Sequence, residues 1–152
     1  MGVAKSDTSR CRHALRGLLG EIEWAVRDAV ETGGKVAELA ARQTTEWKDR
    51  SGKTRKTIRF SLWKQGYGFK LEGRGASVFL EGGTAAHVIT SESGKMLRFV
   101  IGGTFFYRRE VYHPGTKATF FLEHAVVEGA QTVSRNLPLL IARAAQKRGL
   151  GG

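Results

Sequence analysis

The first third of the chain carries an apolar stripe with helical periodicity. From about Ser9 to Thr44, apolar residues recur at intervals of three and four: Leu15, Leu18, Leu19, Ile22, Val26, Ala29, Val30, Val36, Leu39 and Ala40. This spacing predicts one long amphipathic helix. Gly33 and Gly34 each cost about 1 kcal/mol relative to alanine, which leaves open a kink or a break there. Because a single helix cannot bury its own stripe, the rest of the chain must supply a sheet or a second helix.

The middle of the chain has the alternation of strands. Residues 57–64 and 67–73 alternate apolar and polar side chains, with a turn between them, and residues 46–56 are expected to form a loop. Residues 95–101 and 104–113 flank Gly102 and Gly103, which predicts a hairpin with a two-residue primed turn. The period does not decide between strand and short helix for "ASVFLEGGT".

Beyond Pro114 and Gly115 the helical pattern returns, and Pro138 either kinks this helix or begins a second one. The predicted class is therefore α+β, with a long first helix, an antiparallel sheet of about four strands with a projecting hairpin, and a last helix packed on the sheet. We expect a single domain over residues 1–152, with flexible tails at about 1–8 and 146–152.

The composition excludes several classes of protein. Apolar residues make up 41% of the chain and charged residues 26%, as in ordinary globular proteins. No apolar run approaches the ~20 residues of a membrane span, so we expect no membrane contact. Cys11 is alone and can form neither an internal disulfide nor a thiolate metal cage.

The net charge of +11 is unusual, and much of it lies between residues 48 and 74. The candidates for a surface that faces DNA or an acidic partner are Lys48, Arg50, Lys53, Arg55, Lys56 and Arg59. A smaller basic group, Arg143, Lys147 and Arg148, comes near the end of the sequence. Such clusters attract polyanions or acidic proteins, but a merely solvated surface has equal standing on this evidence.

No catalytic or metal-binding motif is complete. "SGKT" at 51–54 lacks the earlier glycine of a phosphate-binding loop, where Trp47 stands instead. His87 and His113 are expected to pack at strand ends and to bind backbone groups. Pairings of Glu81 with His87, or of His113 with Glu123 and His124, remain open in space. We therefore expect a protein without catalysis, cofactor or metal.

Aromatic residues with basic neighbours suggest two roles. A base-stacking surface for nucleic acid is one, but the RNA-recognition signature is absent. Alternation sends about half of these side chains inward, so packing in the core is the favoured prediction. The residues concerned are Trp63, Tyr67, Phe69, Phe105, Phe106, Tyr107 and Tyr112.

Four segments, taken in order, resemble motifs of the small tail-completion, or head–tail joining, proteins of long-tailed bacteriophages. "KDRSGKTRKTIRF" is similar to D-x-G-x-L-R-x-S-I through Gly52, Arg55, Thr57 and Ile58. "ASVFLEGGTAAHVI" is similar to Y-x-x-V-E-x-G-T-x-x-H-x-I through Leu80, Glu81, Gly83, Thr84, His87 and Ile89. "GKMLRF" resembles K-x-L-R-F through Lys95, Leu97, Arg98 and Phe99. "HPGTKATFFLEHA" resembles H-P-G-T-K-P-x-P-F-L-x-x-A through His113, Pro114, Gly115, Thr116, Lys117, Phe121, Leu122 and Ala125.

The resemblance implies a structural protein of the virion neck or tail. Such a protein forms a homo-oligomeric ring, a hexamer by the resemblance, between a head–tail connector or stopper protein and the tail tube protein. It is made in the cytoplasm of the host bacterium, and its channel passes genomic DNA without base-specific contacts. A basic nucleic-acid-binding module that acts as a free protein is the alternative.

The same resemblance gives the hairpin and the two glycine-containing turns a role. The segment from Thr90 to Tyr112 is expected to project as an arm against a neighbouring subunit or the tube, positioned by the "EGGT" and "HPGT" turns. The arm residues expected to touch a partner are Met96, Phe99, Gly102, Gly103, Phe105 and Tyr107.

Overall fold

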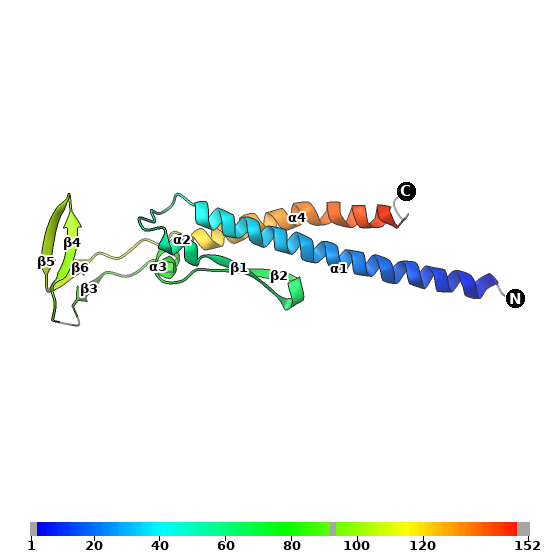
Figure 1. Ribbon diagram of the computed structural model, residues 1–152, viewed down its shortest axis with the longest axis horizontal. Coiled ribbons are helices and arrows are strands. Elements are labelled where there is room, and N and C mark those ends of the chain that lie inside the picture. The colour runs from blue at the N-terminus through cyan, green and yellow to red at the C-terminus, as the bar shows by residue number, and fades with distance from the viewer. Residues whose placement is uncertain (1–2, 92–93, 149–152) are drawn as a thin grey trace.

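Two long antiparallel helices form the body of the molecule. A computed structural model describes residues 3–91 and 94–148, in which α1 (Val3–Gln43) and α4 (Phe121–Lys147) lie side by side (Figure 1). A β-hairpin lies along the helices, and a second group of strands projects beyond one end of the body. The predicted α+β class is confirmed, with a last helix that packs on a sheet.

Helix α1 continues without a break through Gly33 and Gly34. A Cβ atom on Gly33 would lie 2.5 Å from Val133 Cγ2 and 2.7 Å from the carbonyl oxygen of Gly129, both on α4. A Cβ on Gly34 would lie 2.5 Å from Phe60 Cδ2. At the two glycines α1 therefore approaches its neighbours too closely for a side chain, and the break that their presence allowed does not occur.

Small side chains continue this contact along the two helices. Ala25, Ala29, Ala37 and Ala41 of α1 are fully buried, and α4 contributes Ala125, Gly129 and Ala144. Pro138 stands inside α4, which is one helix from Phe121 to Lys147, so no second helix begins at the proline. The larger core side chains gather where α1 ends: Trp47, Ile58 and Phe121, with the Trp47 and Phe121 rings edge to face at 5.2 Å.

The region after α1 differs in part from the expected loop, because Lys53–Thr57 forms a short helix, α2. A hairpin follows, with β1 (Arg59–Trp63) and β2 (Gly68–Glu72) joined by the 3-10 turn η1 (Lys64–Gly66). "ASVFLEGGT", which the period left undecided, forms helix α3 (Ala76–Gly82). A hydrogen-bonded turn ends α2, from Ile58 N to Arg55 O.

The strands do not join into the single sheet of about four that the alternation predicted. Among the described residues, six strands pair as three two-stranded antiparallel ladders: β1 with β2, β3 (His87–Thr90) with β6 (Glu110–His113), and β4 (Leu97–Ile101) with β5 (Thr104–Arg108). The predicted strand 104–113 is two strands, divided at Arg109. Gly102 and Gly103 have φ of 54° and 85°, which confirms the primed turn between β4 and β5.

Residues 85–115 form a projecting arm (Figure 1). In its inner part β3 and β6 pair in one register, from His87 opposite His113 to Thr90 opposite Glu110, and Ser91 N donates to Arg109 O. In its outer part Leu97 pairs with Arg108. Five residues therefore separate Ser91 from Leu97, whereas their partners Arg109 and Arg108 are adjacent. Such an insertion on one strand bends a ribbon, and β4–β5 stands at an angle to β3–β6.

The expected tails fall partly within the helices. Residues 3–8 belong to α1 and residues 146–147 to α4. Residues 1–2 and 149–152 lie outside the described part of the chain.

The molecule exposes much more surface than a compact protein of its mass. Its accessible surface is 11413 Å². A folded monomer of 16.7 kDa is expected to expose about 7,600 Å². The excess of about 3,800 Å² agrees with an elongated shape, in which the arm projects from one end of the body and α1 extends beyond α4 at the other (Figure 1).

We expect Gly129→Ala to destabilise the protein. The added Cβ would lie 2.6 Å from the carbonyl oxygen of Gly33 and 2.9 Å from Phe69 Cζ, and overpacking of this kind costs about 1–3 kcal/mol. Gly20→Ala is the matched control, because its Cβ meets nothing within 4 Å and a helical alanine gains about 1 kcal/mol over glycine. Urea unfolding should therefore show opposite signs for the two variants. A Gly129→Ala protein as stable as Gly20→Ala would contradict the close contact.

Candidate functional site

The two glycine-containing turns singled out in the sequence meet at the base of the arm. Thr84 N donates to Thr116 O at 2.8 Å, and Thr116 N donates to Thr84 O at 3.0 Å. Gly83 has φ of 71°, and a Cβ there would lie 2.6 Å from Thr116 O. Gly115 has φ of 92°, and its Cβ would collide with Thr84 O. Only glycine accommodates both the left-handed backbone and this approach, so the turns form a fixed base for the arm.

Glu81 connects this base to the body by capping α4. Its carboxylate accepts hydrogen bonds from Leu122 N at 2.7 Å and Glu123 N at 3.2 Å. The residue before the helix, Phe120, has no side-chain oxygen, so Glu81 satisfies amides that would otherwise lack acceptors. Thr119 N and Oγ1 both donate to Leu80 O, at 2.9 and 2.8 Å. Helix α3 and the start of α4 are thus held together just where the arm leaves the body.

His87 and His113 lie opposite each other across β3 and β6, with ring centroids 5.1 Å apart. His87 Nδ1 lies 2.9 Å from Ala85 O, and Gly115 N donates to His113 Nδ1 at 3.1 Å. The interpretation of these histidines as strand-end residues bound to backbone is confirmed. The backbone of Gly115 thus contacts His113 through its amide and lies close to Thr84 on the other turn.

The pairings that sequence left open do not assemble an acid–base site. Glu81 binds the amides of α4, and His124 Nδ1 lies 3.1 Å from Glu46 Oε1. Among residues 3–91 and 94–148, no three His, Cys, Asp or Glu side chains gather as metal ligands. Nor does any helix in the same residues combine the length and apolarity that a bilayer span requires.

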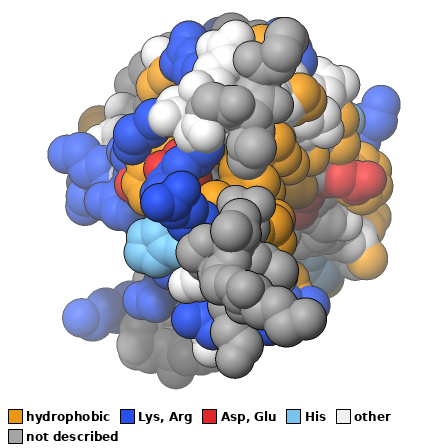
Figure 2. Space-filling model, turned by 90° about the vertical axis from the view of Figure 1, so that its right-hand side faces the viewer, with side chains coloured by type: hydrophobic (Ala, Val, Ile, Leu, Met, Phe, Trp, Pro, Cys, Tyr) orange, Lys and Arg blue, Asp and Glu red, His pale blue; other side chains and the backbone are white. Residues whose placement is uncertain are grey.

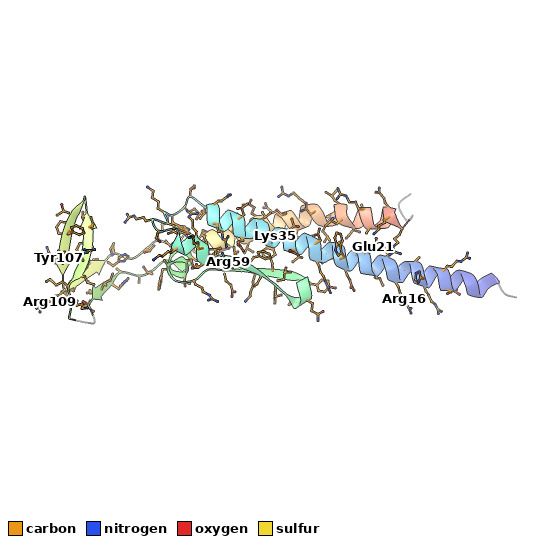
Figure 3. The ribbon with its side chains drawn as sticks, viewed as in Figure 1. Arg16, Glu21, Lys35, Arg59, Tyr107 and Arg109 are labelled. Carbon is orange, nitrogen blue, oxygen red and sulfur yellow. The ribbon has the colours of Figure 1, made fainter. Side chains whose placement is uncertain are left out.

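The arm is apolar on its surface, which corrects the prediction that the strand aromatics pack in the core. Tyr112 is 67% exposed, and Phe105, Tyr107, Trp63 and Tyr67 are each about half exposed. Phe69 and Phe106 are half-buried. A two-stranded ribbon has no layer on either face, so its side chains have only their cross-strand neighbours to pack on. Figure 3 shows Tyr107 and Arg109 on this arm, far from the helices.

The expected contact residues Met96, Phe99, Gly102, Gly103, Phe105 and Tyr107 all lie on or beside the β4–β5 hairpin. Phe99 and Phe106 stack at 5.9 Å, and Arg98 lies over the Phe105 ring at 4.9 Å. Sequence reasoning missed further exposed apolar residues of the arm: Val88, Ile89, Val100 and Ile101. For Val100 and Ile101 the signal was present, because "FVI" at 99–101 is apolar at consecutive positions, as in strands covered on both faces.

The residues of the third and fourth motifs differ in their exposure to solvent. Lys95, Pro114 and Lys117 are exposed, whereas Leu97 and Thr116 are partly buried. Phe121 is 1% exposed and anchors the core at the start of α4.

The predicted basic surface divides into two groups. Arg55 is structural: its guanidinium donates to the carbonyl oxygens of Arg42, Thr44 (2.7 Å) and Trp47 (3.1 Å), and lies 4.5 Å from the Trp47 ring. It thereby caps the end of α1. Arg59 donates to Ile58 O at 2.9 Å and lies 3.9 Å from Glu38. The remaining members, Lys48, Arg50, Lys53 and Lys56, are exposed.

The loop that carries these residues is organised by Asp49. Its carboxylate accepts from Arg55 N at 2.8 Å and from Ser51 N at 3.2 Å. The amide of Arg55 is the main cause that lowers the pKa of Asp49, with further donors at Ser51 and Gly52. Gly52 has φ of 69°, which turns the chain into α2, and Ile58 beyond it is fully buried.

A second basic region lies at the end of the molecule that is opposite to the arm. Figure 2 views the molecule from this end and shows several lysine and arginine side chains on it. Arg148 Nε lies 2.8 Å and Lys147 Nζ 3.6 Å from Glu21 Oε1, so two of these cations tie the end of α4 to α1. Arg16 lies farther out on α1, beyond the end of α4 (Figure 3). Arg143 is exposed.

No protein-family model, curated protein or solved structure matches this chain.

We expect Glu81→Ala to weaken the attachment of the arm to the body. Loss of a side-chain cap at a helix start costs about 1 kcal/mol, within a range of 0.5–2. Urea unfolding measures this loss, and Glu72→Ala is the control, because Glu72 is exposed and pairs only with the exposed Lys70. Equal stability of the two variants would contradict the capping role.

The Asp49 carboxylate makes stability depend on pH. Because its folded-state pKa lies below the ordinary value, it stabilises the fold at neutral pH, and this contribution is lost as pH falls through the folded value. We expect Asp49→Asn to flatten the acid limb of unfolding free energy below about pH 4. Ser51→Ala should keep most of the dependence, since the Arg55 amide remains. Parallel acid limbs for Asp49→Asn and the unchanged chain would contradict this account.

Proposed function

We propose that this chain is a structural protein of a tailed-bacteriophage virion, which assembles into a ring that completes the tail or joins it to the head. The observation that carries the proposal is the arm, whose apolar side chains stay exposed, uncovered by any other part of residues 3–91 and 94–148. Lone two-stranded ribbons are at best marginally stable in water, so an arm of this kind is expected to be completed by another molecule.

The surface area supports an assembly with more than one neighbour. A standard protein interface buries about 800 Å² on each partner. The excess of about 3,800 Å² over a compact monomer is enough for contacts with two neighbours of the same ring and for a further partner. A free-standing globular protein would have no reason to expose it.

The asymmetry of the molecule supports a ring in particular. The arm lies at one end and the bare end of α1 at the other, so different surfaces are available on different sides (Figure 1). Contacts between unlike surfaces of identical chains close into rings when the rotation permits. The motif resemblance adds the hexamer and the location in the neck or tail, and the tube and connector proteins as partners. The chain acts without catalysis and is made in the host bacterial cytoplasm.

The resemblance and the geometry concern the same residues. Two of the four motifs contribute residues that build the base of the arm: Glu81, Gly83, Thr84, His113, Gly115 and Thr116. A fixed arm needs such residue types together, because the turns require glycine and the helix start requires a hydrogen-bond acceptor. This agreement supports the family proposal without requiring an active site.

Lys48, Arg50, Lys53 and Lys56 are proposed to face either the DNA that passes through the ring or an acidic partner. We expect replacement of all four by glutamine to reduce infectivity, while leaving folding intact because these side chains are exposed. Circular dichroism and urea unfolding check the fold. Arg55→Gln is the contrasting variant, since it should instead destabilise the fold through its lost α1 cap. Normal infectivity of the fourfold variant would remove the DNA or acidic-partner role.

A basic nucleic-acid-binding module that acts as a free protein is the second candidate. It is favoured by exposed Tyr107 and Phe105 beside Arg98 on the arm, the residue types on which bases stack. The two candidates differ in what the isolated monomer does. Binding of single-stranded DNA that falls steeply with salt, with no oligomer at any protein concentration, would favour the second candidate.

Particles made without this protein test the leading proposal. We expect electron micrographs of filled heads beside unattached tails, or of tails with abnormal length, and rescue by the intact chain supplied in the same cell. A chain that lacks residues 96–107 should fail to rescue, although the body folds. Normal particles in the absence of the protein would overturn the proposal.

A further inference from the structure

A groove of about 410 Å³ lies between α1 and α4 near the end of the body from which the arm projects. Its apolar lining includes Val36 and Leu39 of α1, and Leu39 is 55% exposed. Glu46 and Glu128 place carboxylates in the same lining. Gln43 and Thr45 also line it, and Glu46 Oε1 lies 3.1 Å from His124 Nδ1. The groove therefore presents apolar side chains among polar ones, with the carboxylate of Glu128 beside them.

The outer part of the arm has the complementary chemistry. The pairing of β4 with β5 places Arg98 opposite Tyr107 and Val100 opposite Phe105, and these four side chains share one face of the ribbon. Val100, Phe105 and Tyr107 are about half exposed, and Arg98 is exposed. This face therefore presents an apolar surface with positive charge beside it.

We propose that the Arg98–Val100–Phe105–Tyr107 face of one copy lies in the α1–α4 groove of the next copy. The inference rests on the proposed ring and specifies the contact that closes it. The partner is a second copy because the arm face carries the positive charge of Arg98 beside apolar side chains, the groove carries negative charge beside apolar side chains, and the arm projects away from its own body (Figure 3).

The arm is long enough for this contact. From Thr84 to Ser91 its inner part spans about 23 Å at 3.3 Å per residue, and β4 extends about 13 Å at an angle to it. Two packed helices are about 20 Å wide. The outer hairpin of one copy thus reaches across the body of a neighbour.

Pairing between the arms of two copies is disfavoured by charge. Arg98, Arg108 and Arg109 are exposed on every arm, so two arms placed together would bring like charges close. In the groove Arg98, which belongs to the docked face, approaches Glu128, whereas Arg108 lies on the opposite face of the ribbon. The unlike surfaces also give the head-to-tail contact that a ring requires.

Disulfide trapping tests the contact directly. In a Cys11→Ser background, which removes the exposed native thiol, Leu39→Cys and Val100→Cys are made as separate proteins and mixed under mild oxidation. We expect a linked heterodimer in about tenfold higher yield than from the control mixture of Val127→Cys with Val100→Cys, since only close cysteines join. Val127 is a fair control, because it is 51% exposed on α4 and does not line the groove.

Charge exchange tests the same contact by sedimentation of the full chain. We expect Glu128→Arg to weaken self-association about tenfold, and Arg98→Glu added in the same chain to restore it. Glu23→Arg, an exposed change on α1 outside the groove, should leave self-association nearly unchanged.

Three results would overturn the inference. Equal yields from the Leu39 and Val127 mixtures, or a dominant link between two Val100→Cys arms, would show a different contact. If either crosslinking result occurred and sedimentation still showed an oligomer, the proposed ring would not be contradicted. A chain that stays monomeric at every concentration would also overturn it, and the rescue of particles would then decide the proposed function independently.

Discussion

The contact between α1 and α4 at Gly33 and Gly129 is the constraint on which the other features depend. Because neither residue has a side chain, the two helices approach until each backbone meets the other, and the alanines on either side continue the contact. Phe60 and Phe69 of the first hairpin then pack against Gly34 and Gly129. The body is consequently thin, with few large side chains inside. Such a body cannot also cover the arm, which leaves the arm's apolar surface available to other molecules.

Much of the fold followed from local pattern. The periods of 3.6 and 2 located both long helices and the hairpins, and the glycine pair at the β4–β5 turn has the expected positive φ. The role of Gly33 could not be predicted, since it depends on Gly129, nearly a hundred residues away in the sequence. The strand aromatics were assigned to the core because alternation tells which side chains share a face, but not whether anything covers that face.

The candidate site was predicted unevenly for the same reason. The two histidines, the glycine turns and the hairpin were found from sequence, because turns and strand ends have local signatures. Arg55 was grouped with its basic neighbours, yet three carbonyl oxygens at the end of α1 hold it. Glu81 was a candidate acid, and its partners are amides some forty residues later. Only the folded structure shows which basic side chains bind backbone carbonyl oxygens and which are exposed to solvent.

One side of the arm is longer than the other between the inner and outer ladders, so the attachment of the arm and the direction of its outer hairpin depend on different residues. Five positions of the sequence separate Ser91 from Leu97, whereas their partners Arg109 and Arg108 are adjacent, and β4–β5 stands at an angle to β3–β6. Shortening or extending that segment would rotate the outer hairpin and leave the bridged threonines and the capped helix undisturbed. The length of this segment is thus a variable that sets the direction of the outer hairpin independently of the base that holds the arm.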